Sequence, residues 1–243
     1  MEKPRSRFKN IFIAATTVRF AILLLSITSD YLLVDHDTST VIHLKEIGAE
    51  ELLGKNSMVY HVHKALVRYD AFFFLKHAHE GHSVEKNFAF FPGYSQALRA
   101  FTKGSLRLNP LASAELVEEY FEVFLITHAL VLNFAFGVAS VLLLYKLSWG
   151  VLGSESMAYK SALLFTINPA TVFHLAPYTA AMFSAVSLFG LAILYPGSRW
   201  RLPGWMRVLC SSVVLMYSVG IRSNGLFFAA IVGYVIFLKL VGY

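Results

Sequence analysis

Long apolar runs separated by short polar stretches dominate this 243-residue chain. A helix needs about 20 mainly apolar residues to cross the hydrocarbon core of a membrane. We predict six membrane-spanning helices, at residues 11–34, 120–147, 157–175, 178–195, 206–221 and 225–241. The third and fourth runs are short and adjoin at Pro177, which favours a bent pair. The pattern therefore predicts an all-α polytopic membrane protein, with all 243 residues in a single transmembrane domain.

Composition supports the membrane interpretation and excludes two other classes. Only 15% of residues are charged and 56% are hydrophobic, with a mean hydropathy of +0.58, whereas soluble domains carry about 25% charge. The net charge of +6 does not indicate nucleic-acid binding, because the basic residues lie at helix ends and form no basic patch. The single cysteine, Cys210, excludes an intrachain disulfide framework.

The basic residues also predict the orientation of the chain. Lys3, Arg5, Arg7 and Lys9 precede the first run, and cytoplasmic flanks are enriched in Lys and Arg. Counting spans from a cytosolic N-terminus makes the loop 195–207 cytosolic as well, and this loop is again rich in arginine. The N-terminus is therefore expected in the cytosol.

The same count assigns three regions to the opposite, luminal face: residues 35–119, the turn at 174–180 and the tetrapeptide 222–225. The segment 35–119 is too long for a featureless loop. We expect it to form short helices lying on or near the membrane surface.

Two aspartate motifs in this luminal loop could carry chemistry. Asp35 and Asp37 follow the first run in "VDHD", and Asp70 lies in the aromatic stretch "RYDAFFFL". A carboxylate that is partly desolvated at a membrane boundary is a stronger base, which suits general-base catalysis. The alternative is that Asp35 and Asp37 only cap or solvate the end of a helix.

Histidines raise a rival hypothesis, a zinc site. The motifs "YHVHK" and "LKHAHEGHS" supply His61, His63, His77, His79 and His82, with Glu80 among them. Zinc favours imidazole ligands, but this spacing is not the helical H-E-x-x-H pattern that places two histidines on one face. Histidines in contact with solvent or lipid headgroups account better for the pattern, and no metal is expected.

Polar residues inside the runs give two further expectations. Arg19, His128 and Asn133 are costly to expose to lipid, so each is expected to face protein or a cavity. The alternative for Arg19 is that its long side chain snorkels to the membrane interface. In "GIRSNG", Arg222 ends one run on the predicted luminal face. A guanidinium can bind phosphate through two parallel hydrogen bonds, and the alternative is an arginine that only anchors the helix end.

Three stretches taken together resemble the GPI mannosyltransferase 2 family. They are "YDAFFFLKHAHEGHSVEKNFAFFPGYS", "LLFTINPATVFHLAPYTAAMFSAVSLFG" and "GIRSNGL", in this order and spacing. The resemblance implies a helical bundle of the GT-C class, in the endoplasmic reticulum membrane, with its active face in the lumen. It implies transfer of mannose from dolichyl-phosphate-mannose, in α1,6 linkage, to the first mannose of a GPI precursor. The implied inverting reaction needs no metal or cofactor, and a small accessory membrane subunit is a further partner to test.

The resemblance also assigns site residues. Asp35 and Asp70 are the implied catalytic carboxylates, with Asp35 favoured as the base and Asp70 as the group that orients a substrate. The implied substrate-binding residues are Glu85, Asn87, Phe90, Phe91, Pro92, Tyr178, Arg222 and Asn224. Residues 87–101 are expected to lie at the luminal interface, with their rings against lipid or a dolichyl chain. An aromatic belt without any substrate is the alternative.

The chain departs from the family pattern at four points, one of which is Phe72 and Phe73, at positions that are often more polar in the family. Tyr69 stands where the family has Trp, and Thr179-Ala180 replaces a Ser-Glu pair, so one family carboxylate is missing. Family members continue past the position of Tyr243, so we expect the chain to be truncated at its C-terminus relative to the family. The alternative function is therefore a catalytically inactive membrane subunit or isoform with the same fold.

Overall fold

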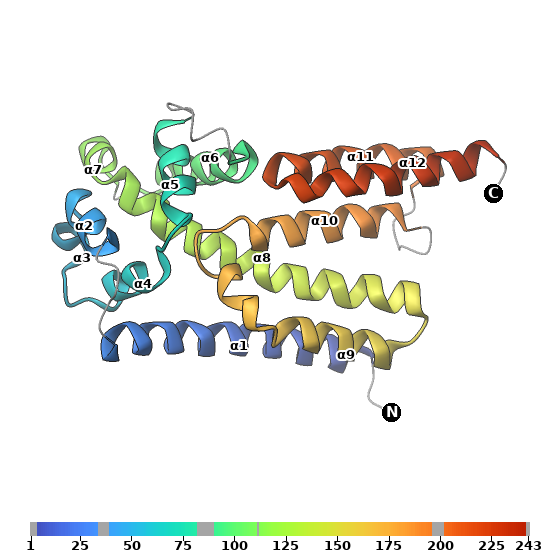
Figure 1. Ribbon diagram of the computed structural model, residues 1–243, viewed down its shortest axis with the longest axis horizontal. Helices are drawn as coiled ribbons and strands as arrows, with labels where there is room; N and C mark the ends of the chain where they lie inside the picture. The colour runs from blue at the N-terminus through green and yellow to red at the C-terminus, as the bar shows by residue number, and fades with distance from the viewer. Residues whose placement is uncertain (1–3, 34–38, 82–89, 111, 196–201, 242–243) are drawn as a thin grey trace. The chain divides into compact units, whose positions relative to one another are not determined.

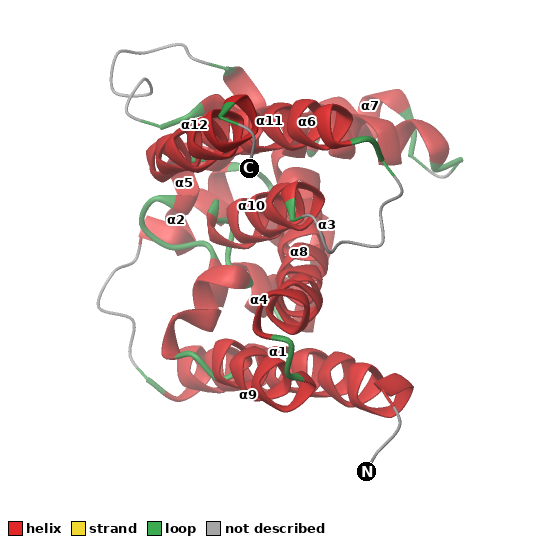
Figure 2. Ribbon diagram, turned by 90° about the vertical axis from the view of Figure 1, so that its right-hand side faces the viewer, coloured by secondary structure: helices red, strands yellow, loops and turns green. Residues whose placement is uncertain are grey.

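The computed structural model describes residues 4–33, 39–81, 90–110, 112–195 and 202–241. Helices joined by loops make up these residues, and none of them lies in a strand (Figure 2). The prediction of an all-α polytopic membrane protein is confirmed.

Three helices are long and apolar enough to cross a membrane: α1 (Pro4–Leu32), α8 (Phe121–Leu152) and α11 (Gly204–Ile221) (Figure 1). Two more apolar helices, α10 (Ala180–Leu194) and α12 (Phe227–Leu240), are shorter. These five helices correspond to five of the six apolar runs in the sequence.

The run predicted at 157–175 does not form one helix. Its first part is α9 (Glu155–Thr166), whose 12 residues are about 18 Å long at 1.5 Å per residue. A separate 3₁₀ helix follows at Pro169–His174. Proline disfavours the helical conformation in the residue before it, so Pro169 accounts for the interruption. That this run crosses the membrane stays a prediction.

The segment predicted as a loop with short helices does contain them. They are α2 (Ser39–Glu46), α3 (Ala49–Leu53), α4 (Met58–Leu66), α5 (Ala71–Glu80), α6 (Pro92–Leu108) and α7 (Ala114–Glu119). Local capping explains several starts. The hydroxyl of Ser57 accepts a hydrogen bond from the Tyr60 amide at the start of α4, and Pro92 occupies the first turn of α6, where its missing N–H costs nothing. The luminal and interfacial position of these helices stays a prediction.

The chain divides into two compact units. The first comprises residues 1–18, 136–169 and 179–243, and the second comprises residues 19–135 and 170–178. The second unit contains the short helices, and the first contains α9 to α12.

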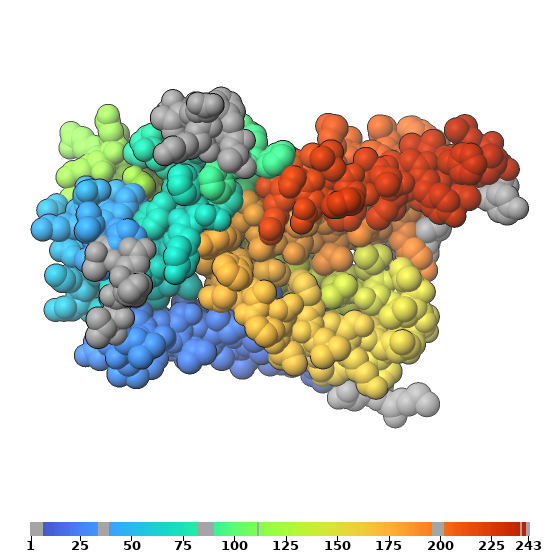
Figure 3. Space-filling model, in the orientation of Figure 1, coloured from blue at the N-terminus to red at the C-terminus, as the bar shows by residue number. Residues whose placement is uncertain are grey.

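Close packing of α10 on α11 holds part of the first unit together. A side chain at Gly190 would place its Cβ 2.7 Å from the side chain of Leu215, and the Ser211 hydroxyl donates a 2.9 Å hydrogen bond to the Gly190 carbonyl. Small residues allow this close approach of helix backbones. Figure 3 shows α11 and α12, in orange-red and red, lying side by side. Exposed apolar residues on these two helices include Leu209, Val213, Met216, Phe227 and Tyr234.

Polar contacts join the first residues of α1 to α8 and α9 in the same unit. Arg7 lies 3.8 Å from the carboxylate of Glu155, which also accepts a 3.0 Å hydrogen bond from the Tyr145 hydroxyl. The ammonium of Lys146 lies 5.1 Å from the ring centre of Phe8. These contacts fix α9 beside the N-terminal part of α1.

Candidate functional site

The turn of residues 67–70, between α4 and α5, presents two exposed side chains, Tyr69 and Asp70. Asp70 precedes the first residue of α5 and makes no side-chain hydrogen bond to that helix end. The carbonyl of Asp70 instead accepts backbone hydrogen bonds from Phe73 and Phe74 at 3.1 and 3.3 Å. The helix therefore fixes the backbone of Asp70 and leaves its carboxylate accessible.

Side chains from distant parts of the second unit hold the same turn. The buried hydroxyl of Thr40, on α2, donates a 2.8 Å hydrogen bond to the Val67 carbonyl. The hydroxyl of Tyr178 donates a 2.9 Å hydrogen bond to the Arg68 carbonyl. Two successive carbonyls of the turn are thus bound by residues 27 and 110 positions away.

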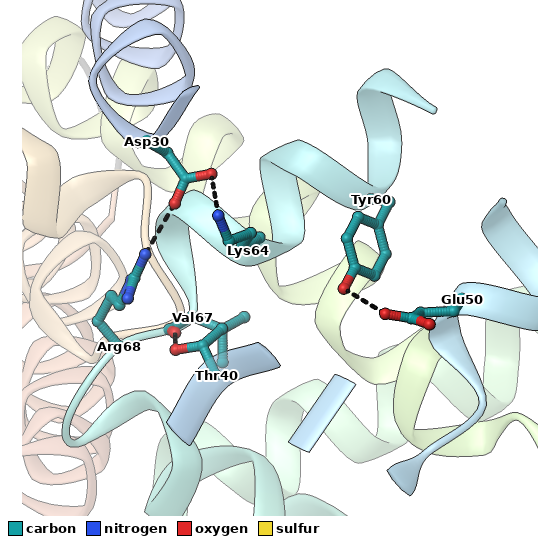
Figure 4. Close-up of polar contacts among 7 residues, drawn as sticks. All are labelled: Asp30, Thr40, Glu50, Tyr60, Lys64, Val67 and Arg68. Carbon is teal, nitrogen blue, oxygen red and sulfur yellow. Dashed lines mark hydrogen bonds and ion pairs between the residues drawn. The ribbon is translucent and has the colours of Figure 1, made fainter. Parts of the chain in front are cut away.

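The side chain of Arg68 provides a third attachment, to α1. Its guanidinium donates a 2.8 Å hydrogen bond to Asp30, and the ammonium of Lys64 lies 3.1 Å from the other oxygen of the same carboxylate (Figure 4). The Asp30 side chain is only 3% exposed. A carboxylate so deeply buried needs close cations, and these two provide them.

Tyr69 has a backbone conformation that is rare for its residue type. Its φ of 49° lies in the left-handed region, which glycine and asparagine tolerate best. Such a conformation costs about 1–3 kcal/mol and persists only where the surrounding structure imposes it. Hydrogen bonds to the carbonyls of Val67 and Arg68 hold the backbone immediately before Tyr69.

An aromatic cluster packs around α5 and includes two predicted site residues, Phe90 and Tyr178. The Phe90 ring stacks on Phe73 with centroids 4.8 Å apart, and it meets Phe74 edge-on at 5.2 Å. Tyr94 and Tyr178 contact Phe74 as well. Phe90 therefore contributes to the packing of the second unit. Phe91, which is 37% exposed, offers more of its ring to a ligand or to lipid.

Tyr178 is the predicted binding residue whose role the geometry makes clearest. Burial, followed by the negative charge of Asp70, raises the pKa of the Tyr178 hydroxyl. The hydroxyl therefore stays protonated at neutral pH and continues to donate to the Arg68 carbonyl. Asp70 itself is exposed, and its desolvation at a membrane boundary stays a prediction.

The predictions for polar residues in the apolar runs are confirmed. Arg19 and Asn133 have no exposed surface, and His128 hydrogen-bonds Ser105 at 3.1 Å and the Phe124 carbonyl at 2.7 Å. The Asn133 amide donates to the carbonyls of Ala176 and Tyr178. Through these bonds α8 fixes the segment that carries Tyr178.

The histidines serve as packing and pairing groups. His63 is buried beside Thr127, at 3.1 Å, and burial lowers its pKa to about 4. His79 and His43 each lie against an oxygen of Glu122, at 3.4 and 3.1 Å. Within the described residues, no group of three His, Cys, Asp or Glu side chains could hold a metal ion. His82 lies outside those residues.

In the first unit, Arg222 ends α11 with an extended backbone and an exposed side chain. Its guanidinium carbon lies 5.8 Å from the centre of the Phe183 ring. Asn224 is exposed beside it, and the Gly225 amide donates a 2.9 Å hydrogen bond back to the Arg222 carbonyl. The motif therefore presents a guanidinium and an amide from one tight turn.

Gly225 is required by this turn, because a Cβ there would lie 2.6 Å from the backbone nitrogen of Val219. We expect Gly225→Ala to lower the free energy of unfolding by about 1–3 kcal/mol, as overpacking does. The matched control is Gly233→Ala in α12, where a Cβ meets nothing within 4 Å. Thermal unfolding in detergent should show a lower Tm for Gly225→Ala alone, and equal Tm values for the two variants would contradict this account.

Three predicted site residues, Asp35, Glu85 and Asn87, lie outside the described residues. Among the others, Asp70 and Tyr178 come together at the turn of residues 67–70, and Pro92 begins α6. Sequence reasoning missed Asp30, Lys64 and Arg68. A signal was present, since Asp30 is a charged residue inside the apolar run 11–34 and a charge there requires a partner.

Residues 8–243 match the family model described as mannosyltransferase (PIG-V). The chain is 35% identical over 161 residues to GPI alpha-1,6-mannosyltransferase 2 of Cricetulus griseus, an alignment that covers 66% of this chain and 29% of that protein. The human protein of the same name is 32% identical with the same coverage. GPI mannosyltransferase 2 of Aspergillus fumigatus is 25% identical over 84% of this chain and 40% of its own length. No solved structure matches the chain.

Proposed function

The chain belongs to the mannosyltransferase (PIG-V) family, and from this membership we propose that it transfers mannose to a GPI-anchor precursor. The donor is dolichyl-phosphate-mannose, and the new bond is an α1,6 linkage to the first mannose of the precursor. The reaction takes place on the luminal face of the endoplasmic reticulum membrane. The chain spans 29% to 40% of the length of these relatives.

The observation that carries this proposal is the accessible carboxylate of Asp70 on a turn held from three sides. Thr40, Tyr178 and Asp30 fix the backbone and side chains around it. A site that performs chemistry needs such fixed geometry, because small displacements of a reacting group are costly. Tyr69 and Asp70 of this turn begin the family-like motif "YDA", and its alanine, Ala71, is the first residue of α5.

In the proposed reaction three charged residues have separate roles. Asp35 removes the proton from the acceptor hydroxyl, whose oxygen bonds to the anomeric carbon of mannose as the bond from that carbon to the phosphate oxygen breaks. Asp70 orients a substrate, and Arg222 stabilises the charge that develops on the departing phosphate. The phosphate leaves without protonation, so one base suffices, and a single displacement inverts the anomeric centre.

In this proposal the other predicted residues contribute to binding of the substrates. Glu85, Asn87 and Asn224 offer polar contacts to sugar hydroxyls, and Phe91 offers an exposed ring beside Pro92. Phe90 and Tyr178 act indirectly in this proposal, through the packing of α5 and the hydrogen bond to the turn. Dolichyl-phosphate-mannose and the GPI precursor are the partners in this proposal. Co-purification tests whether an accessory membrane subunit also binds the protein.

Complementation tests the function. Cells that lack GPI mannosyltransferase 2 activity are transfected with the complete gene, and GPI-anchored protein at the cell surface is measured by flow cytometry. We expect surface display to return. A stably expressed, membrane-inserted protein that leaves display at the level of the empty vector would favour the inactive subunit instead.

The proposed orientation predicts which side of the membrane each of two segments lies on. A glycosylation acceptor sequence with a short glycine spacer, inserted after the exposed Lys55, should be glycosylated, because residues 35–119 are assigned to the lumen. The same insert at Arg201, in the loop assigned to the cytosol by its arginines, should stay unmodified. A mobility shift on gels, reversed by glycosidase, reports each outcome, and modification at Arg201 alone would invert the orientation.

A further inference from the structure

We propose that Asp30 is a positioning residue for the candidate site, acting through Arg68 on the turn that carries Tyr69 and Asp70. The effect of Asp30 on catalysis rests on the proposed function. Its effect on the turn rests only on contacts within the second unit.

The position of Asp30 makes it suited to this role. It lies near the end of α1, a long helix whose backbone is fixed by its own hydrogen bonds, and its side chain is almost fully buried. Each carboxylate oxygen meets a different cation, Arg68 at 2.8 Å and Lys64 at 3.1 Å. The carboxylate is therefore a fixed point to which the guanidinium is attached.

Arg68 transmits this attachment to the site, because it is bound at both ends. Its guanidinium is bound to Asp30, while its carbonyl accepts from Tyr178. Tyr69 follows directly in its left-handed conformation, and Asp70 is next. Loss of the Asp30 contact frees one of the three attachments, so the turn can relax out of the rare conformation and carry the Asp70 carboxylate with it.

Glu50, which Figure 4 also shows, provides a matched control in the same unit. Glu50 accepts a 3.1 Å hydrogen bond from the Tyr60 hydroxyl and lies 3.7 Å from Lys55. Like Asp30 it is a carboxylate paired with a cation, but its contacts do not include the turn of residues 67–70. Glu50→Gln therefore removes a comparable charge without changing the proposed attachment.

The first experiment measures how readily the turn opens locally and needs no assay of activity. In the complete protein in detergent, amide hydrogen exchange of residues 68–72 is compared for wild type, Asp30→Asn, Arg68→Gln and Glu50→Gln. We expect at least about tenfold faster exchange in the first two variants and unchanged exchange in the third, since local opening exposes these amides. Unchanged exchange in Arg68→Gln would overturn the proposal, and this variant keeps the test decisive if Asp30→Asn does not fold.

The second experiment links the turn to transfer. Asp30→Asn and Arg68→Gln should each lower kcat/KM by at least about tenfold. The double variant should have the same kcat/KM as the less active of the two single variants, because the effects of residues that act as one unit are not additive. Glu50→Gln should match wild type. Additive losses, or normal transfer despite faster exchange, would overturn the positioning role. Absence of transfer in wild type would instead reject the proposed function and leave the exchange result standing.

Discussion

We expect Asp35→Asn to abolish mannosyl transfer by the complete protein while expression and membrane insertion stay normal. The amide keeps the shape of the carboxylate but cannot accept the proton of the acceptor hydroxyl. Loss of a general base lowers a rate by about 10²–10⁴-fold, so we expect transfer below one hundredth of wild type. The measurement is GPI-anchored protein at the surface of complemented cells, followed by the rate of transfer in isolated membranes.

The companion variant Asp70→Asn decides between the two aspartates. Because Asp70 is assigned to orienting a substrate, its amide should leave residual activity, and the larger loss should belong to Asp35. Normal transfer by Asp35→Asn together with a dead Asp70→Asn would reverse the assignment. Full activity of both variants would show that neither carboxylate is the base.

Arg222→Gln is expected to reduce transfer about 10- to 100-fold, because a hydrogen bond to a charged group contributes about 1.5–3 kcal/mol and each 1.36 kcal/mol is a factor of ten in rate. Arg222→Lys should recover only part of the loss, since an ammonium cannot form the paired bonds of a guanidinium. Steady-state kinetics with varied donor measures both.

The contact between Arg222 and Phe183 supplies the control for this prediction. Phe183→Leu removes the ring but keeps the guanidinium, so transfer should fall by less than about threefold if the charge is what matters. A loss in Phe183→Leu as large as that in Arg222→Gln would mean that Arg222 serves the packing of the helix end and not the phosphate.

Hydropathy was sufficient to predict the five apolar helices α1, α8, α10, α11 and α12. The runs around α1, α8 and α11 are long and continuous, so tertiary contacts do not change their assignment. The run at 157–175 differs, because Pro169 interrupts an otherwise apolar stretch. A count of apolar residues does not register that break, although the Asn-Pro pair is itself a recognised signal for the end of a helix.

The site was only partly predictable for a different reason. Asp70 and Tyr178 were identified as separate motifs, but their meeting depends on a hydrogen bond between residues 110 positions apart. The pairing of Asp30 with Arg68 spans 38 positions; the charge of Asp30 inside an apolar run indicates that it has a partner but not which residue that partner is. The left-handed Tyr69 is similarly hidden, because tyrosine is not a residue that normally indicates this conformation.

Transfer in a defined system tests the central claim most directly. Liposomes containing the purified complete protein are supplied with dolichyl-phosphate-mannose labelled in the sugar and with a GPI precursor that carries one mannose. We predict a labelled product with a second mannose that an α1,6-specific mannosidase removes, and none when the donor is a nucleotide-linked mannose. Folded protein that forms no such product, or a product of another linkage, would contradict the account.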